Sequence, residues 1–292
     1  MKSINPDDFR VSKHIMLATV PTNLEKYSDD DDEKEGELEK IQKKLSERQD
    51  VMYAHNRHAV LICLQGMDTS GKDSLIREVF KEFNSRGVVV HSFKTPNSTE
   101  LEHDYLWRHY LALPEKGKFG VFNRTHYENV LVTRVHPEYI LFENLPGIEK
   151  VEDIKPKFWK SRMKQINNFE KHITKNGTLV LKFYLHMSKE EQRKRLLKRL
   201  ESGEDNWKFS VGDLKERELW DEYQKCYEEA INETSTKHSP WFIVPADDKE
   251  MARVIVAKII WEELQKLTDI KEPELDPKVK ANIEEYKELL KD

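Results

Sequence analysis

The fold is decided by residues 59–80, which read AVLICLQGMDTSGKDSLIREVF. The apolar run 59–65 is short and ends at a glycine, which is typical of a buried parallel strand. Residues 70–84 have the pattern of a helix. Between them lies G-x-x-x-x-G-K, the spacing of a Walker A loop, whose backbone N–H groups wrap an anion. The pattern predicts a phosphate-binding P-loop formed by Gly66, Thr69, Ser70, Gly71, Lys72 and Ser74.

One position departs from the standard loop. Asp73 follows the lysine, where a serine or threonine usually ligates magnesium, and Asp68 lies inside the loop. Two carboxylates beside phosphates repel them unless a cation lies between. The sequence therefore indicates Mg²⁺, held by Asp68 alone or by both carboxylates.

Further strands are expected on either side of this stretch. Apolar runs at 87–93, 118–123, 178–186 and 240–246 alternate with helical patterns at 37–56, 98–112, 155–175, 189–201, 213–231 and 249–267. Ser188, Asp248 and Ser98 stand at expected helix starts, where their side chains can cap the helix. Alternating strands and helices predict an α/β fold, a three-layer αβα sandwich around a parallel sheet of about five strands.

The charge is distributed unevenly along the 292 residues. The net charge is −5, which by itself disfavours a polyanionic partner. Residues 25–40 carry a net −6 and residues 271–292 a net −2, whereas residues 41–270 carry a net +2. The acidic run 29–33 is interpreted as a solvated linker, with a metal-binding cluster as the alternative.

These patterns predict three parts. Residues 1–36 form an acidic extension whose removal should leave the active site intact, 37–270 form the P-loop domain, and 271–292 form a helical tail. No apolar run is long enough for a membrane span or a signal peptide. With only Cys63 and Cys226, a reducing cytoplasm is the expected location.

A second group of polar residues follows the strand expected at 118–123. Asn123 ends this strand, Arg124 suits a phosphate clamp, and Glu128 lies four residues further on. Ligands bind at the carboxyl edge of such sheets, so these residues should lie beside the P-loop. From spacing alone, Glu128 is either a magnesium ligand or an ion-pair partner of Arg124 or Arg134.

Four stretches extend the pattern well beyond the P-loop: residues 65–80, 91–139 with FNRTHYENVLVTRVHPEY, 182–229, and 240–249 with PWFIVPADDK. Over roughly residues 38–268 the chain resembles the family-2 polyphosphate kinases. The form of residues 122–136 is similar to the subgroup that phosphorylates both AMP and ADP. In other subgroups an aspartate stands at the position of Asn123.

The resemblance implies Mg²⁺-dependent transfer of the terminal phosphoryl group of inorganic polyphosphate to AMP or ADP, with GDP as a further acceptor and with reversal expected in principle. Mn²⁺ is a candidate substitute for Mg²⁺. The implied catalytic residues are Asp68, Lys72, Asp73, Asn123, Arg124 and Glu128, with Asp68 and Glu128 as metal ligands. The implied nucleotide contacts are Lys94, Arg108, Arg124 and Glu128. No general base is assigned, because the acceptor is already an ionised phosphate oxygen.

Five of the seven residues from 193 to 199 are basic. Beside a P-loop, this segment resembles the helical lid of the family, expected at about 188–225, that closes cations over phosphates. The cations expected to bind polyphosphate are Arg134, Arg195, Arg199 and Lys215. Relatives commonly assemble as dimers or tetramers, so a homo-oligomer is expected, without nucleic acid or membrane as partner.

Two other functions fit parts of the pattern. One is a P-loop kinase that uses ATP to phosphorylate a small metabolite, although Asp73 and the basic lid disfavour it. The other is a polyanion-binding module without catalysis, in which many cations share the load and Lys72→Ala costs little. Formation of ATP from polyphosphate and ADP separates the leading hypothesis from both.

Overall fold

The computed structural model describes residues 2–24, 27–202, 206 and 209–291. Within this part, five parallel strands form one sheet in the order β2-β3-β1-β4-β5. The strands are β1 (Ala59–Gln65), β2 (Val88–Ser92), β3 (Phe119–Asn123), β4 (Thr178–His186) and β5 (Trp241–Pro245). The predicted parallel αβα fold is confirmed, and β1 and β4 have the bounds expected from the sequence.

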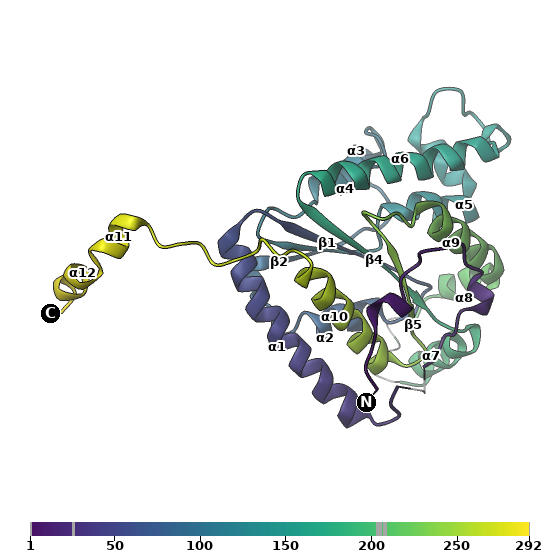
Figure 1. The fold of residues 1–292 in the computed structure, drawn as a ribbon. Helices are drawn as coiled ribbons and strands as arrows, with labels where there is room; N and C mark the ends of the chain where they lie inside the picture. Colours follow the sequence, from purple (N-terminus) through teal and green to yellow (C-terminus); the bar gives the residue numbers. More distant parts are fainter. Residues whose placement is uncertain (1, 25–26, 203–205, 207–208, 292) are drawn as a thin grey trace.

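Helices cover both faces of the sheet (Figure 1). The longer ones are α1 (Asp31–His55), α2 (Lys72–Val79), α6 (Pro156–Lys175), α7 (Lys189–Glu201), α8 (Val211–Glu218), α9 (Trp220–Thr234) and α10 (Lys249–Gln265). The shorter ones are α3 (Ser98–Leu101), α4 (Trp107–Leu111), α5 (Val132–Val135), α11 (Pro277–Ala281) and α12 (Ile283–Leu289). The 3₁₀ turns are η1 (Pro6–Asp8), η2 (Leu17–Thr19), η3 (Ser85–Gly87), η4 (His126–Val130), η5 (Pro137–Glu143) and η6 (Val151–Asp153).

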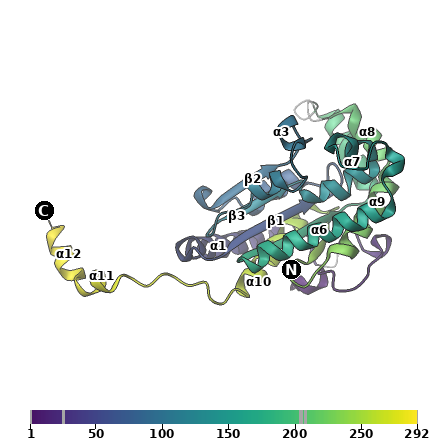
Figure 2. The same ribbon diagram turned by 90° about the horizontal axis from the view of Figure 1, so that it is seen from above.

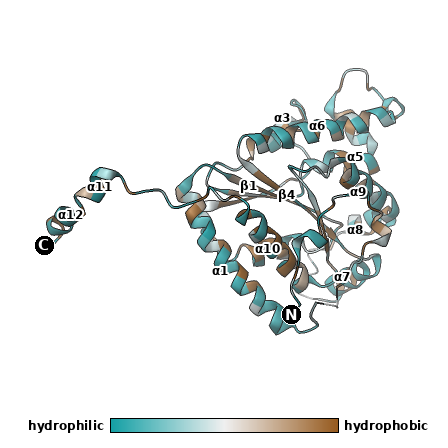
Figure 3. Ribbon diagram, in the orientation of Figure 1, coloured by the Kyte–Doolittle hydropathy of each residue, from teal (hydrophilic) through white to brown (hydrophobic). Residues whose placement is uncertain are grey.

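The alternation of side chains along β1 divides the core into two layers. Val60, Ile62 and Leu64 belong to the large cluster that includes residues of α1, α2 and α10. Leu61 and Cys63 belong to a second cluster, with Phe169 and Ile173 of α6 among its other members. Apolar residues are accordingly concentrated in the strands and on the inner faces of the helices (Figure 3). Both faces of β1 are buried, and the strand positions the loop that follows it.

Helix starts followed the sequence closely where a capping side chain was recognisable. Ser188 accepts a hydrogen bond from Glu191 N at 3.0 Å, and Asp248 accepts one from Met251 N at 3.0 Å. The expected cap at Ser98 was wrong by one residue. The cap is Asn97, which forms a reciprocal capping box with Glu100.

Two expected helices are interrupted. The helix predicted over 98–112 is split into α3 and α4, because the Asp104 side chain accepts a hydrogen bond from Leu106 N at 2.9 Å and holds a turn there. The helix predicted over 213–231 is two helices, α8 and α9, which meet at Leu219. The helix predicted over 70–84 is shorter and ends at Val79.

The acidic run is exposed to solvent, as interpreted, but it is not a linker, because Asp31, Asp32 and Glu33 belong to α1. Asp30 caps α1 and accepts hydrogen bonds from Asp32 N and Glu33 N, so the next acids form the first helical turn. Negative charge is favourable at this end of a helix. Lys34 also relieves the repulsion, because its buried ammonium lies 2.8 Å from Asp31 and 2.7 Å from Asp248.

The N-terminal residues are packed into the domain, and residue 36 lies inside α1. Val11 N donates to Trp241 O at 2.9 Å and Ile243 N donates to Phe9 O at 2.9 Å, so the segment pairs with the edge strand β5. Phe9 and Leu17 are buried in the large core cluster. The N-terminal segment is therefore packed into the domain, and the expectation that removal of residues 1–36 leaves the active site intact stays a prediction. At the other end, α11 and α12 project from the body (Figures 1 and 2).

Candidate active site

The P-loop connects β1 to α2 at the carboxyl edge of the sheet. Gly66 is needed for close approach, since a Cβ there would lie 2.7 Å from Ser70 Oγ and 3.0 Å from Leu185 O. Gly71 precedes α2 with φ +98°, a conformation that side chains rarely adopt. Thr69 also has positive φ, and its buried hydroxyl has no hydrogen-bond partner within the described structure. The loop therefore presents a strained backbone and a free polar group, both of which suit an anion.

Lys72 folds over this loop. Its Nζ donates to Gly66 O at 2.7 Å and to Met67 O at 3.2 Å. Burial lowers the pKa of the Lys72 ammonium, and the neighbouring Asp68 carboxylate opposes that shift. The amine thus lies at the centre of the P-loop, in the place that the sequence predicted.

The turn after β3 meets the P-loop through two side-chain pairs. Asn123 Nδ2 donates to Asp73 Oδ1 at 2.5 Å, and Arg124 Nη2 lies 3.3 Å from Asp68 Oδ1. Arg124 is 49% exposed and Asp68 is 31% exposed, so both remain accessible from solvent. The predicted convergence of the two sequence groups at one edge of the sheet is therefore observed.

Glu128 is partly buried and lies close to Arg124. Gln65 Nε2 donates to Glu128 Oε1 at 3.0 Å and to Thr125 Oγ1 at 3.1 Å. Burial raises the pKa of Glu128, while the Arg124 guanidinium counteracts the increase. From the sequence, the role of Glu128 was either that of a metal ligand or that of an ion-pair partner of Arg124 or Arg134. The charge of Arg124 acts on it, whereas Arg134 pairs elsewhere.

Helix α7 contacts the backbone of the P-loop. Gln192 Nε2 donates to Asp68 O at 3.1 Å, and Arg195 Nη1 donates to Thr69 O at 3.0 Å. Arg195 also donates to Glu191 Oε1, Ala246 O and Asp247 O at 2.7–2.9 Å, and only 8% of its side chain is exposed. A guanidinium with four protein acceptors ties α7 to the loop and to the end of β5.

The other expected lid cations lie closer to solvent. Arg199 Nη1 is 3.6 Å from Asp213 Oδ2, and Lys215 is exposed on α8. Burial raises the pKa of Asp213, and the nearby Asp68 carboxylate adds to the increase. Arg217 of α8 donates to Gln192 Oε1 at 2.8 Å, and Gln192 in turn donates to Asp68 O, so α8 is connected to the P-loop through α7. Residues 203–205 and 207–208 of the predicted lid lie outside the described residues.

Two predicted cations, Arg134 and Arg108, pair with the protein itself. Arg134 Nη2 lies 2.6 Å from Glu229 Oε2, and its guanidinium lies over the Trp159 ring, in the layer of α5, α6 and α9. Arg108 Nη1 donates to Lys94 O at 2.8 Å and to Glu100 Oε2 at 3.2 Å. Lys94 itself has an exposed side chain. Arg108 therefore stabilises the loop after β2. This loop begins beside Asn123, where Phe93 N donates a hydrogen bond to Asn123 O.

Sequence reasoning missed three residues of the site. Gln65 was read only as the last residue of an apolar strand, yet its amide holds Glu128. Tyr227 donates to Gln65 Oε1 at 3.4 Å, and Tyr223 donates to Glu216 Oε2 at 2.6 Å. Burial raises the pKa of the Tyr223 hydroxyl, with Glu216, Glu128 and Asp68 adding to the increase. The polar Gln65 at the end of a buried strand was the one available signal.

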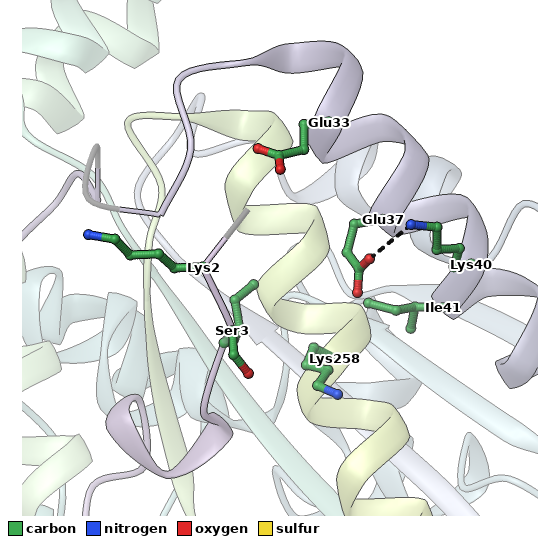
Figure 4. Close-up of a pocket in the computed structure, with 8 residues that line it drawn as sticks. Lys2, Ser3, Glu33, Glu37, Lys40, Ile41 and Lys258 are labelled. Carbon is green, nitrogen blue, oxygen red and sulfur yellow. Dashed lines mark ion pairs between the residues drawn. The ribbon is translucent and has the colours of Figure 1, made fainter.

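A separate cavity of about 410 Å³ lies between the N-terminal segment, α1 and α10 (Figure 4). Its lining includes Lys40, paired with Glu37 at 3.6 Å, and Lys258, paired with Glu262 at 2.8 Å. None of the predicted site residues lines this cavity. The candidate active site is therefore the open edge formed by the P-loop and the turn after β3.

Comparison with known proteins agrees with this geometry. The family described as Polyphosphate kinase 2 (PPK2) matches residues 27–140 and 141–272. The chain belongs to the polyphosphate kinase 2 family. It is thus an enzyme, and a polyphosphate kinase by family, as the resemblance of the sequence predicted.

The relatives found for this polyphosphate kinase match most of its length. It is 46% identical to the ADP-polyphosphate phosphotransferase of Rhodopseudomonas palustris, over 90% of this chain and 91% of the relative. It is 44% identical to the AMP/ADP-polyphosphate phosphotransferase of Meiothermus ruber, over 78% and 79% of the two chains. The crystal structure of polyphosphate kinase 2 from Arthrobacter aurescens TC1 superposes with a TM-score of 0.88 at 33% identity, covering 98% of this chain and 97% of that chain.

The described helices include none that combines the length and the apolar character needed to cross a membrane.

Proposed function

We propose that this polyphosphate kinase transfers the terminal phosphoryl group of inorganic polyphosphate to ADP and AMP, forming ATP and ADP. GDP is proposed as a further acceptor, and the reaction as reversible. The observation that carries the proposal is the convergence of Lys72 and Arg124 with Asp68, Asp73 and Asn123 at one edge of the sheet. The names of the relatives from R. palustris and M. ruber agree with both acceptors.

The proposed reaction needs positioning and charge neutralisation more than a base. The attacking group is a phosphate oxygen that is already ionised near neutral pH, so no side chain has to remove a proton. Lys72 and the P-loop amides bind and orient phosphates, and Arg124 stabilises the charge that develops on the transferred group. Arg195 acts on this site through the P-loop backbone, which it holds.

Mg²⁺ fits the donors of the site. Asp68 and Glu128 are the proposed ligands, and the negative charge of each opposes the lowering of the Lys72 pKa by burial. In the described part of the chain, no group of three His, Cys, Asp or Glu side chains could enclose a metal. Mg²⁺ commonly uses one or two carboxylates and completes its shell with water and substrate phosphates. Bound there, it would neutralise phosphate charge, and Mn²⁺ is the proposed substitute.

The direct test combines polyphosphate, ADP and Mg²⁺ and measures ATP by luciferase luminescence. Wild-type protein should form ATP, and AMP in place of ADP should yield ADP. Lys72→Ala should abolish nearly all turnover while retaining the thermal stability of the wild type. Phosphorylation of a hydroxyl compound by ATP, without any ATP formed from polyphosphate, would instead show a metabolite kinase.

A homo-oligomer of two or four copies in the cytoplasm is also proposed. Both cysteines, Cys63 and Cys226, are buried and free, which suits a reducing compartment. Light scattering coupled to gel filtration tests the assembly, and a monomeric mass at assay concentrations would contradict it.

A further inference from the structure

A network of buried polar side chains lies behind the turn that carries Arg124 and Glu128. At its centre is Glu170 of α6. Glu170 Oε1 accepts hydrogen bonds from Tyr127 OH at 2.7 Å and His126 Nε2 at 3.1 Å. Glu170 Oε2 accepts from Lys182 Nζ at 2.6 Å and Ser239 Oγ at 2.8 Å. We call these five residues the Glu170 network.

The network is fully buried, and both oxygens of its central carboxylate are hydrogen-bonded, whereas His126 Nδ1 has no partner within the described structure. The side chains of Glu170, Lys182 and His126 have no exposed surface. Lys182 Nζ uses its remaining donors on Tyr127 OH at 2.8 Å and Thr234 O at 2.8 Å. The Tyr127 ring also packs edge-on against Trp241, with ring centroids 4.7 Å apart. Four segments of the chain, α6, β4, η4 and the residues before β5, are therefore joined at one carboxylate.

Stability alone does not account for such a network. A buried ion pair contributes little or less than well-packed apolar residues of the same volume, because desolvation offsets the attraction. The specific effect of the Glu170 network is geometric, since it fixes where His126 and Tyr127 lie. These two residues stand between Arg124 and Glu128 in the chain.

The turn before them needs such support. Arg124 has φ +58°, a conformation that costs a residue with a side chain about 1–3 kcal/mol and persists only when its surroundings hold it. Before Arg124, Asn123 is fixed by the sheet register with β1. After it, Thr125 Oγ1 accepts from Gln65 Nε2 and from Tyr127 N, both at 3.1 Å. Gln65 holds the turn on the side of the site, and the Glu170 network holds it from behind.

We propose that Tyr127 is a positioning residue of the phosphoryl transfer, through which the Glu170 network holds the Arg124 turn in its strained conformation. The inference rests on the proposed function. Tyr127 is buried, so its effect is transmitted by the backbone that it shares with Arg124 and Glu128. Loss of its hydroxyl should loosen the turn and displace the guanidinium relative to Asp68.

The first test is Tyr127→Phe, which keeps the ring against Trp241 and removes one donor to Glu170. A small displacement of a positioned group can cost about 100-fold, so kcat should fall about 10- to 100-fold. The KM for ADP should stay within about twofold of the wild-type value, because the lost interaction stabilises only the transition state. The matched control is Ile259→Val, in a fully buried position on α10 across the sheet, which should lower Tm similarly and leave kcat unchanged.

Two further readouts separate positioning from general stability. In a double-mutant cycle with Arg124→Lys, Tyr127→Phe should lower kcat much less than it does in the wild type, because both changes act on the same group. Amide hydrogen exchange at residues 124–128 should accelerate in Tyr127→Phe and not in Ile259→Val. The exchange measurement does not depend on activity, so it tests positioning even if wild-type protein forms no ATP and the proposed function fails.

A second variant protects the test against misfolding. Ser239→Ala removes one donor to Glu170 without touching residues 123–128, and it should give a smaller fall in kcat with the same local exchange signature. Additive effects in the cycle, or unchanged exchange at residues 124–128 in both folded variants, would overturn the inference.

Discussion

The turn after β3 and helix α7 both bring an arginine to the P-loop, and the two arginines differ in what surrounds them. Arg124 is half exposed and has one carboxylate partner at 3.3 Å. Arg195 is 8% exposed and donates to one carboxylate and three backbone carbonyls. The same residue type can therefore meet the substrate in one place and build the site in the other. Accessibility and existing partners distinguish the two roles.

The largest expected effect is that of Arg124→Ala on turnover. Loss of a positioned charge at the transferred phosphoryl group should lower kcat/KM about 100- to 1,000-fold. Tm should change little, because an exposed ion pair contributes about 0–1 kcal/mol. Steady-state kinetics and a thermal melt on the same preparation measure both. A large fall in Tm with intact kinetics would reverse the assignment of the two arginines.

Arg195→Ala should have the opposite signature. Removing a buried guanidinium leaves three carbonyls and Glu191 without their donor, at a cost of about 3 kcal/mol in unfolding free energy. Turnover of the folded fraction should stay within about tenfold of wild type. Urea denaturation and kinetics at low temperature check this pair of outcomes. An unchanged midpoint together with a large rise in the KM for polyphosphate would support the original prediction that Arg195 binds phosphate.

The pH dependence of kcat/KM sharpens the contrast. Burial raises the pKa of Glu128, and Arg124 opposes the increase. As pH falls, Glu128 should therefore take up its proton above the ordinary carboxyl range, and activity that needs its carboxylate should decline there. Arg124→Ala removes the opposing charge, so the acid limb of its residual activity should move to higher pH. Arg195→Ala serves as the control, because the acid limb of its kcat/KM profile should lie at the same pH as in the wild type.

The smallest expected effect is that of Arg199→Ala. Its ion pair with Asp213 spans 3.6 Å and is partly exposed, so Tm should be unchanged. If Arg199 meets the polyphosphate chain as proposed, the KM for polyphosphate should rise a few fold while the KM for ADP stays constant. If neither the KM for polyphosphate nor the KM for ADP differs between Arg199→Ala and the wild type, Arg199 does not bind the polyphosphate chain.

Local signals explain how much of this structure was predictable. β1 and β4 are buried runs bounded by turns, and Ser188 and Asp248 are recognisable caps, so these boundaries were predicted correctly. The proximity of the P-loop and the turn after β3 was predictable, because the carboxyl ends of parallel strands meet at one edge of the sheet. Asp68, Lys72, Asn123 and Arg124 consequently lie where the sequence placed them.

The misses depend on contacts that no local pattern encodes. The helical start of the acidic run is capped by Asp30 and is also stabilised by Lys34, whose partner Asp248 is 214 positions away in the chain. Arg195 and Arg134 resemble free cations until their acceptors on distant segments are known. Gln65 is the last residue of an apolar strand, and only the fold shows that its amide faces Glu128.

The pairing of residues 9–11 with β5 sets an order of events during synthesis. Phe9 and Val11 leave the ribosome first, while their partners Trp241 and Ile243 emerge more than two hundred residues later. A contact of such large sequence separation is slow to form, because the intervening chain must be ordered first. The amino terminus should therefore be the last strand-like segment to close, and until then the outer edge of β5 stays open to mispairing with a neighbouring nascent chain.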